Sequence, residues 1–367
     1  MKTVKILLCA ILILGINSQS IAQQKIQLVI LFDTSNSMDG LIDQAKSRIW
    51  AIVNNVSDLK YQGTTPSLEI AMFDYGNTGI SKTNWIRKQI DFTTDLDLVS
   101  QKLFALRTNG GEEYCGAAIK ESLDDLKWSN NTNDLKLIYI AGNEPFNQGP
   151  INYKEVCLEA QSKGIIISTI YCGDYNQGIK EFWKDGATCS KGEYFNINSD
   201  RTITHIKTPY DDEINKKNNE LNKTYMWYGS QGKSKKAMQM NEDNNSMVQS
   251  ASVAVERTIA KSKSNYKNTN YDLVDAMAAD SMVIQKLSKS ELPEEMKGKS
   301  EKEIEEMIVL KSEERTEIQK EISELSVKRQ KFIDEERKKM SQSEKSDDFG
   351  TAVNKSIKEI ANSKGFQ

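Results

Sequence analysis

The stretch IQLVILFDTSNS, residues 26–37, decides the fold of this chain. Its first part, Ile26–Phe32, is a continuous apolar run, which is typical of a β-strand buried on both faces of a sheet. Its second part, DTSNS at 33–37, follows that run directly and carries one carboxylate and two hydroxyls. Residues 41–56 then show apolar side chains at helical spacing. The pattern predicts a buried strand, a polar loop and an amphipathic helix.

The same alternation continues along the first half of the chain. We expect further strands at 68–73, 85–92, 135–141, 165–171 and 194–197, and helices at 96–106, 117–126, 153–162 and 179–187. Alternation of strands and helices predicts an α/β fold with a doubly wound, mostly parallel sheet. Ligands of such sheets bind at the carboxyl ends of the strands, so the loops that follow strands are the ones to inspect.

The composition changes near residue 205, where glycine and tryptophan give way to Lys, Glu, Asn, Ser and Met. We expect a first domain at 25–205 and an α-helical region at 206–340, with a polar linker near 229–245. Residues 341–367 are expected to be a loosely ordered tail. A long helix is predicted at 300–340, and its imperfect apolar stripe fits either packing on one face or a coiled coil through which the chain forms an oligomer.

The first 22 residues have the features of a secretory signal peptide. Two lysines precede an apolar run at 6–16, and Ser20-Ile21-Ala22 resembles a small-x-small cleavage site. Cleavage after Ala22 predicts an exported protein, periplasmic or extracellular. No later segment is apolar enough to span a membrane.

Export affects whether the four cysteines that follow the signal peptide form disulfides. In an oxidising compartment they permit two disulfides, with three alternative pairings. Cys115 follows a Gly-Gly loop and Cys172 ends a strand, so both are expected at the carboxyl edge of the sheet. Cys157 and Cys189 lie on or just after neighbouring helices. The pairs Cys115–Cys172 and Cys157–Cys189 are therefore expected, although some of these residues could be reduced and simply buried.

Charge and histidine content exclude several classes of function. The 367 residues carry a formal net charge of −3, whereas nucleic-acid-binding proteins normally have a strong basic excess. His205 is the one histidine of the chain, which excludes metal sites that need two histidines.

The DTSNS loop is the best candidate for chemistry. A carboxylate and two hydroxyls on a tight loop can present three oxygens to one point, and hard cations such as Mg²⁺ take oxygen ligands. The alternative is that Asp33 or Ser35 is an ordinary helix cap. Asp74, which comes at the end of the second strand, is expected to line the same rim.

Residues 25–200 are similar to the von Willebrand factor A (VWA) domain family. The similarity rests on DTSNS at 33–37, LEIAMFDYGN at 68–77, IDFTTDLDLVSQKLFALRTNGGEEYCGAAI at 90–119 and LKLIYIAGNEP at 135–145. This resemblance implies a Rossmann-like sheet that carries a metal-ion-dependent adhesion site (MIDAS). It implies that Ser35 and Ser37 bind Mg²⁺, Mn²⁺ or Ca²⁺ directly, that Asp33 does so largely through water, and that an acidic side chain of a protein partner completes the metal shell.

Two positions depart from the pattern of that family. The family usually has Gly-Gly-x-Thr with the Thr as a ligand, and Glu113 stands at that position here. It also has Thr-Asp-Gly after the fourth strand, where this chain has Ala141-Gly142-Asn143 and then Glu144, so Asn143 or Glu144 would substitute. A carboxylate at 113 neutralises more of the metal charge, which favours a structural metal or less acidic partners. Alternatively, Glu113 points to solvent and the site is degenerate.

The sequence thus predicts a non-enzymatic, exported protein that binds other proteins through a divalent metal. One alternative is a metal-free scaffold that acts through its C-terminal helices. A remote alternative is a phosphatase similar to the haloacid dehalogenases with Asp33 as nucleophile, but Ser35 stands where that family has a second Asp. A hydrolase with a catalytic histidine would have to use His205, and no Gly-x-Ser-x-Gly elbow is present.

Overall fold

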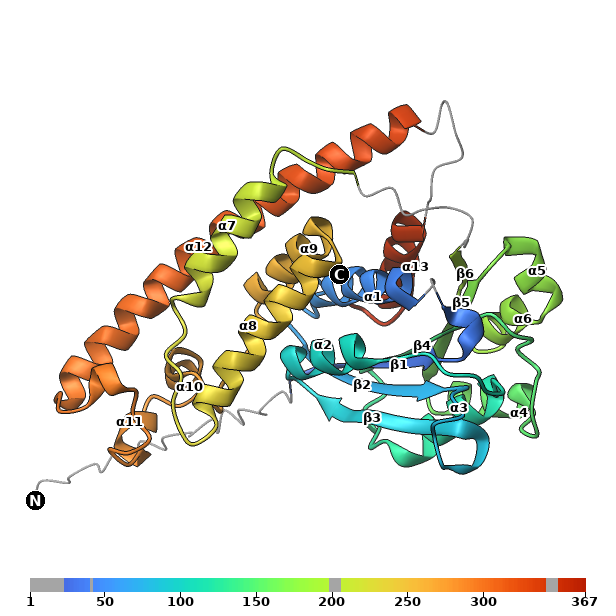
Figure 1. Ribbon diagram of the computed structural model, residues 1–367, viewed down its shortest axis with the longest axis horizontal. Coiled ribbons are helices and arrows are strands. Elements are labelled where there is room, and N and C mark those ends of the chain that lie inside the picture. The colour runs from blue at the N-terminus through green and yellow to red at the C-terminus, as the bar shows by residue number, and fades with distance from the viewer. Residues whose placement is uncertain (1–22, 40–41, 198–205, 341–348) are drawn as a thin grey trace, which may run out of the picture.

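The computed structural model describes residues 23–39, 42–197, 206–340 and 349–367. Its centre is a six-stranded sheet in the order β3-β2-β1-β4-β5-β6 (Figure 1). The strands are β1 (Lys25–Asp33), β2 (Ser67–Tyr75), β3 (Ile86–Thr93), β4 (Leu135–Gly142), β5 (Ile165–Cys172) and β6 (Tyr194–Ile197). All neighbours are parallel except β3, which pairs antiparallel with β2 at one edge. The predicted doubly wound, mostly parallel sheet is confirmed.

The strand register brings three loops together at one edge. β1 lies between β2 and β4, with Asp33 opposite Tyr75 and Phe32 opposite Ala141. The carboxyl ends of these three strands therefore stand side by side. The segments that follow them, at 34–39, 76–85 and 143–152, start from the edge where doubly wound sheets bind ligands.

Each face of the sheet is covered by its own helices, because side chains alternate along every strand. One face packs on α1 (Ile42–Ser57) and α2 (Leu96–Ala105). The other packs on α3 (Cys115–Asp125), α4 (Tyr153–Ser162) and α6 (Trp183–Thr188). The helix expected at 179–187 is interrupted: α5 (Tyr175–Lys180) ends before Phe182, whose φ of 67° lies in the left-handed region, and α6 then begins.

The remaining helices form layers on the α1/α2 side (Figure 1). They are α7 (Asp211–Asn222), α8 (Gly232–Gln249), α9 (Ala251–Ser262), α10 (Leu273–Ala279), α11 (Val283–Lys286), α12 (Glu301–Met340) and α13 (Phe349–Ser363). α8 packs on α2, α9 packs on α1, and α7 and α12 pack on α9. The apolar core runs from the sheet into these helices, through residues such as Ile214, Val253, Ile322 and Val353.

The long helix α12 begins and ends within one residue of its predicted bounds. It packs on α7, α9, α10 and α11 of its own chain. The gap in its apolar stripe precedes Arg315, which is buried and bonded to Asp272 at 2.7 Å. Arg329, further along, is also buried and bonded to Asp211 at 2.9 Å. Buried arginines thus interrupt the stripe, and these contacts fit the expected packing on one face.

The predicted polar linker at 229–245 is wrong, because most of it belongs to α8. Gln239 and Glu242 on this helix are buried although they are polar. The Ser100 hydroxyl on α2 donates a hydrogen bond of 2.8 Å to Glu242. Since this contact is polar rather than apolar, α8 lacks the apolar stripe that marks a packed helix in a sequence. Further along this helical region, residues 271–287 hold two short helices, α10 and α11.

The predicted loosely ordered tail is also wrong where the structure describes it. Helix α13 packs on α1, and the backbone N–H and C=O groups of Gln367 pair with those of Lys60, both at 2.7 Å. Residues 341–348 lie outside the described part. The tail contributes buried apolar side chains at helical spacing: Val353, Ile357, Ile360, Ala361 and Phe366.

The structure forms one of the two expected disulfides. Cys157 on α4 and Cys189 after α6 are bonded, as predicted. Cys115 and Cys172 are both free and buried, so the predicted second bridge is wrong. The reason is the pleat: the Cys172 side chain belongs to the core on the α1 face, whereas Cys115 belongs to the core on the α3 face. Both residues lie near the same edge, but the sheet separates them.

Two expectations fall on residues outside the described part, namely the signal peptide at 1–22 and the domain boundary at 205. Among the residues that are described, no helix is both long enough and apolar enough to cross a membrane.

Candidate metal centre

Asp33 is the most buried member of the candidate site. It ends β1, and none of its surface is exposed. Its Oδ1 accepts a hydrogen bond of 2.8 Å from the backbone N–H of Ser35. Its Oδ2 is buried and has no hydrogen-bond partner. A buried polar atom without a hydrogen-bond partner destabilises the folded state, so we expect this oxygen to bind a proton or a cation.

Two hydroxyls gather beside Asp33. The loop turns through a short 3₁₀ segment, η1 (Asn36–Met38), which brings the Oγ atoms of Ser35 and Ser37 within 2.8 Å of each other. The Ser37 hydroxyl donates a hydrogen bond of 2.9 Å to Oδ1 of Asn143, which follows β4. Nδ2 of Asn143 returns a bond of 3.3 Å to the backbone oxygen of Ser37. The loops after β1 and β4 are therefore joined at the hydroxyls.

Glu113 reaches the same place from the loop that precedes α3. Only 5% of its surface is exposed. A Cβ atom on Gly76 would lie 2.8 Å from Cγ of Glu113 and 2.9 Å from Oδ1 of Asp33, so both side chains border one small space. A Cβ on Gly111 would lie 2.0 Å from the carbonyl oxygen of Gly76, so only glycine lets the loop come this close. The alternative in which Glu113 points to solvent is wrong.

Burial dominates the electrostatics of both carboxyls. It raises the pKa of Asp33 to about 7, and it raises the pKa of Glu113 to about 7. Hydrogen bonds from Ser35 lower both pKa values, and the charge of Glu144 raises both. Without a cation, these carboxyls therefore take up protons near neutral pH. A divalent ion at this place favours the charged form of both.

Glu144 stands beside the cluster rather than inside it. It is half-buried, and its backbone oxygen accepts a hydrogen bond of 2.8 Å from Nε1 of Trp183. Its carboxylate acts on Asp33 and Glu113 through charge. Contacts thus join five of the six candidate ligands to one another, namely Asp33, Ser35, Ser37, Glu113 and Asn143.

Asp74 is engaged elsewhere. Its carboxylate pairs with Arg87 at 2.6 Å and accepts a hydrogen bond of 2.9 Å from Gln89, both on β3. It also accepts a longer bond of 3.3 Å from the Thr34 hydroxyl. Asp74 therefore ties the edge strand β3 to β2 and supports the loop from behind.

Tyr75 also borders this site, although it was not among the residues predicted from the sequence. Its hydroxyl donates a hydrogen bond of 3.0 Å to the carbonyl oxygen of Ala141. A Cβ on Gly142 would lie 2.6 Å from that hydroxyl and 3.0 Å from Oδ2 of Asp33. Tyr75 thus closes the space below Asp33. Its position at the end of a buried strand, opposite Asp33 in the register, was the available signal.

The donor set decides which ions fit. In the described parts of the chain, no three His, Cys, Asp or Glu side chains group together in a way that could hold a metal. The cluster offers two carboxylates, two hydroxyls and one amide oxygen instead. Hard cations such as Mg²⁺ and Ca²⁺ take such oxygens, and Mg²⁺ commonly keeps several waters with one or two carboxylates. The residues present therefore fit a hard divalent ion, whose most evident ligand is the unpartnered Oδ2 of Asp33.

Asp174, which follows β5, is engaged away from this cluster. It caps α5 and accepts hydrogen bonds of 2.9 Å from the N–H groups of Asn176 and Gln177. That is a structural role. His205 lies outside the described residues.

Comparison with known proteins gives one family match. Residues 27–208 match the model of the von Willebrand factor type A domain. No curated protein matches the chain in sequence.

Several solved structures are similar to about half of the chain. The conserved hypothetical protein BatB from Bacteroides thetaiotaomicron is 16% identical, with a TM-score of 0.37 over 47% of this chain and 90% of that one. The SpRpn10 VWA domain is 14% identical, with a TM-score of 0.38 over 48% and 90%. Proximal thread matrix protein 1 from the mussel byssus, solved with a zinc-occupied MIDAS motif, is 10% identical, with a TM-score of 0.36 over 49% and 43%.

Proposed function

Because residues 27–208 form a von Willebrand factor type A domain, a type of domain that commonly mediates protein–protein interaction, we propose that this chain binds a protein partner through a divalent metal at the carboxyl edge of its sheet. The observation that carries the proposal is the buried Oδ2 of Asp33, which has no hydrogen-bond partner and belongs to a carboxyl beside which further oxygens gather. Ser35, Ser37, Glu113 and Asn143 supply those oxygens, with Glu144 beside them. Mg²⁺ is the expected ion, with Mn²⁺ and Ca²⁺ as alternatives.

The charges of the site affect which partner groups the metal would attract. Asp33 and Glu113 together offset the charge of a divalent ion when both are ionised. A metal neutralised in this way attracts a partner carboxylate less strongly than one held by a single carboxylate and hydroxyls. We therefore expect the metal to order the loops after β1 and β4 and to accept a neutral oxygen of the partner as readily as an acidic one.

Export is the second part of the proposal. It rests on the signal-like features of residues 1–22 and is supported by the Cys157–Cys189 disulfide, since disulfides persist in oxidising compartments. We infer a periplasmic or extracellular location after cleavage at Ala22, and no enzymatic activity.

A metal-free scaffold remains the second candidate function. The observation that favours it is the raised pKa of Asp33 and Glu113, because carboxyls that take up protons near pH 7 can stay buried without a metal. In that case the helices would carry the interaction, and α12 exposes Val309, Leu310 and Val327 for a partner or a second copy.

Calorimetric titration with Mg²⁺, Mn²⁺ and Ca²⁺ separates the two functions. Saturable binding that is lost in a Ser35→Ala/Ser37→Ala variant supports the metal-dependent function. A folded protein that binds none of the three ions overturns it and leaves the scaffold.

A further inference from the structure

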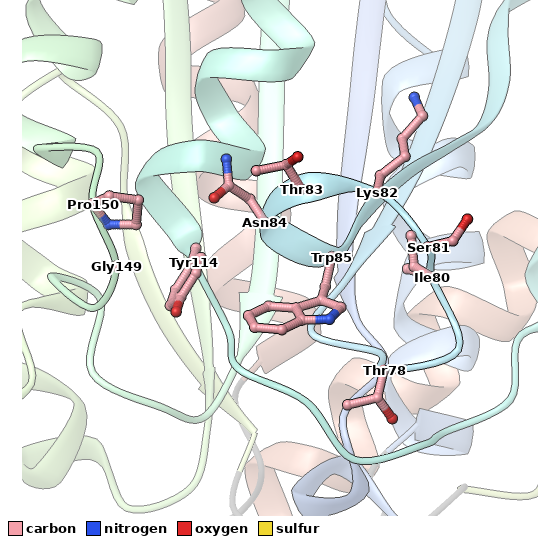
Figure 2. A pocket seen from close by; sticks show the side chains of 10 residues that line it. All are labelled: Thr78, Ile80, Ser81, Lys82, Thr83, Asn84, Trp85, Tyr114, Gly149 and Pro150. Atoms are coloured by element: carbon pink, nitrogen blue, oxygen red, sulfur yellow. The ribbon is translucent and has the colours of Figure 1, made fainter.

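A groove opens beside the candidate metal centre, between the loop that leads into β3 and the loops that precede α3 and α4 (Figure 2). Two of the residues that line it are aromatic, Trp85 and Tyr114, with ring centroids 5.7 Å apart and planes tilted by 54°. Both side chains are half-buried, so each ring leaves part of its surface to a ligand. The remaining lining residues are Thr78, Ile80, Ser81, Lys82, Thr83, Asn84, Gly149 and Pro150.

The backbone holds this aromatic pair in a costly conformation. Asn84 has a φ of 65° and Trp85 a φ of 50°, so two successive residues with side chains occupy the left-handed region. This is a true outlier for a residue as bulky as Trp. Gly149 has a φ of 92°, and a Cβ there would lie 2.5 Å from the Tyr114 ring. In Figure 2, Gly149 and Pro150 lie on one side of Tyr114 and Trp85 lies on the other. Such strain clusters at binding sites, where the surroundings hold it in place.

The aromatic pair is continuous with the candidate metal centre. Tyr114 directly follows Glu113, which borders the space beside Asp33. The carbonyl oxygen of Trp85 accepts a hydrogen bond of 3.1 Å from the N–H of Gly76, which lies against the side chains of Asp33 and Glu113. A polypeptide that meets the metal can therefore reach the two rings within a few residues.

The rim of this region carries excess negative charge. The charge of Glu144 acts on the buried Asp33 and Glu113, and the charge of Glu112 acts on Glu113, so a divalent ion that offsets the two buried carboxyls leaves the two outer carboxylates without compensation. Glu112 is exposed, and its carboxylate accepts a hydrogen bond of 2.6 Å from the hydroxyl of Tyr114. A negative charge thus stands at the edge of the aromatic pair.

Two cationic side chains belong to the same loops, and each is engaged away from the rings. Lys82 forms an ion pair with Glu121 at 3.5 Å, and Figure 2 shows its amine directed away from Trp85. The guanidinium of Arg107 donates hydrogen bonds to the carbonyl oxygens of Phe104 and Leu106, both at 2.8 Å. The aromatic pair and Glu112 therefore face solvent as an acidic, electron-rich surface.

We propose that the groove binds a basic segment of the protein partner, with an arginine side chain over Trp85 and Tyr114 and its guanidinium paired with Glu112. Aromatic faces attract cations, Trp most strongly, and Arg is the cation that most often stacks on them. The acidic rim supplies charge complementarity, which favours a basic segment over an acidic one. This inference rests on the proposed function only in taking the carboxyl edge of the sheet as the surface that meets a protein.

The test uses the full mature chain and NMR detection of its tryptophan indole N–H groups. The probes are capped pentapeptides, Gly-Gly-Arg-Gly-Gly and its Gln and Asp analogues, together with cellohexaose. We expect the Arg peptide to shift the indole signal that disappears in a Trp85→Leu variant, and to bind about tenfold more tightly than the Gln peptide, as a cation–π contact predicts. Added salt should weaken this binding.

Matched variants test whether the Arg peptide binds at this groove. Trp85→Leu and Glu112→Gln should each weaken binding of the Arg peptide severalfold, and Trp85→Phe should retain most of it. Tyr175→Leu should not change it, because Tyr175 is an exposed aromatic on α5 that also packs on a second ring, Tyr194. Equal affinity for the Arg and Gln peptides, a preference for the Asp peptide, or a Trp85 shift with cellohexaose alone overturns the proposal.

The same titration distinguishes this proposal from the proposed function. In EDTA, or in the Ser35→Ala/Ser37→Ala variant, the Arg peptide should still shift Trp85, since the rings do not bind the metal. Binding of the Arg peptide without any metal binding would support the proposed groove and contradict the proposed metal-dependent function. Metal binding without a preference for the Arg peptide would support the metal-dependent function and contradict the groove.

Discussion

Ser37 and Asn143 are 106 residues apart in the sequence and exchange two hydrogen bonds. One runs from the Ser37 hydroxyl to the Asn143 side chain, and the other returns from the Asn143 amide to the Ser37 backbone. The contact exists because β1 and β4 are neighbours in the sheet, so the loops that follow them begin side by side. Residues that were predicted separately as metal ligands therefore meet at one point.

From this contact we propose that Asn143, rather than Glu144, substitutes for the missing acidic residue of the family pattern. Asn143→Ala should lower the affinity for Mg²⁺ about tenfold or more, because Ser37 loses the partner that orients its hydroxyl. Glu144→Gln should have a smaller effect, since Glu144 acts through charge alone. Calorimetric titration of both variants measures the difference in Mg²⁺ affinity. An equal loss of affinity in the two variants would contradict the assignment to Asn143 alone.

In the proposed function, Glu113 would set the charge that the metal presents to a partner. Glu113→Thr restores the hydroxyl of the family pattern and removes one negative charge from the site. We expect this variant to bind Mg²⁺ more weakly but to bind acetate, a stand-in for a partner carboxylate, more tightly in the presence of the metal. Unchanged values of both affinities would contradict the role assigned to Glu113.

The raised pKa values predict how stability depends on pH. Asp33 and Glu113 have pKa values of about 7 in the folded protein, against ordinary values of 3.8 and 4.5. In EDTA, the folded state keeps protons that the unfolded chain releases between about pH 4 and pH 7, so these two groups lower the free energy of unfolding as the pH rises through that window.

Saturating Mg²⁺ should remove this loss, because the metal stabilises the ionised carboxylates in the folded state. Urea denaturation at pH 5, 6, 7 and 8, with Mg²⁺ and with EDTA, measures the gap between the two conditions. The gap should widen with pH in the natural protein and stay nearly constant in a Ser35→Ala/Ser37→Ala variant. If the gap in the free energy of unfolding does not change with pH in the natural protein, this would be evidence against a metal bound by these carboxyls.

The cysteines give a prediction that is independent of the metal. Under native conditions Cys115 and Cys172 should resist alkylation, because both thiols are buried. After unfolding, mass spectrometry of the mature chain should find two alkylated thiols without reductant and four with it. A linked Cys115–Cys172 peptide would contradict the structure. The double variant Cys157→Ser/Cys189→Ser should lose about 3–4 kcal/mol of stability, as expected for a loop that spans 32 residues.

The sheet and its loops were predictable because their signals are local. Apolar runs such as Ile26–Phe32 and Leu135–Ala141 become central parallel strands with bounds within one or two residues of those expected. The DTSNS loop follows from the end of the first run. Contacts between the candidate ligands then follow from the strand order, in which β1 lies between β2 and β4.

The helical region was less predictable because its packing is polar. Arg257 on α9 is buried and pairs with Asp97 on α2 at 2.6 Å and with Asp243 on α8 at 2.8 Å. Charged residues usually indicate a solvated surface in a sequence. Here charged residues form the contact between helices. Because α8 is therefore rich in polar residues, its sequence resembled that of a linker. The missing Cys115–Cys172 bridge has a different cause, since proximity at one edge did not specify on which face of the sheet each side chain lies.

The measurement that tests the central claim most directly is calorimetric titration of the mature protein with Mg²⁺, at pH 8 so that Asp33 and Glu113 have lost most of their protons. The account predicts one saturable site per chain, binding abolished by Ser35→Ala/Ser37→Ala, and a melting temperature that rises with Mg²⁺ in the natural protein alone. A folded protein that takes up no Mg²⁺, Mn²⁺ or Ca²⁺, or binding that survives loss of both hydroxyls, would contradict the metal centre.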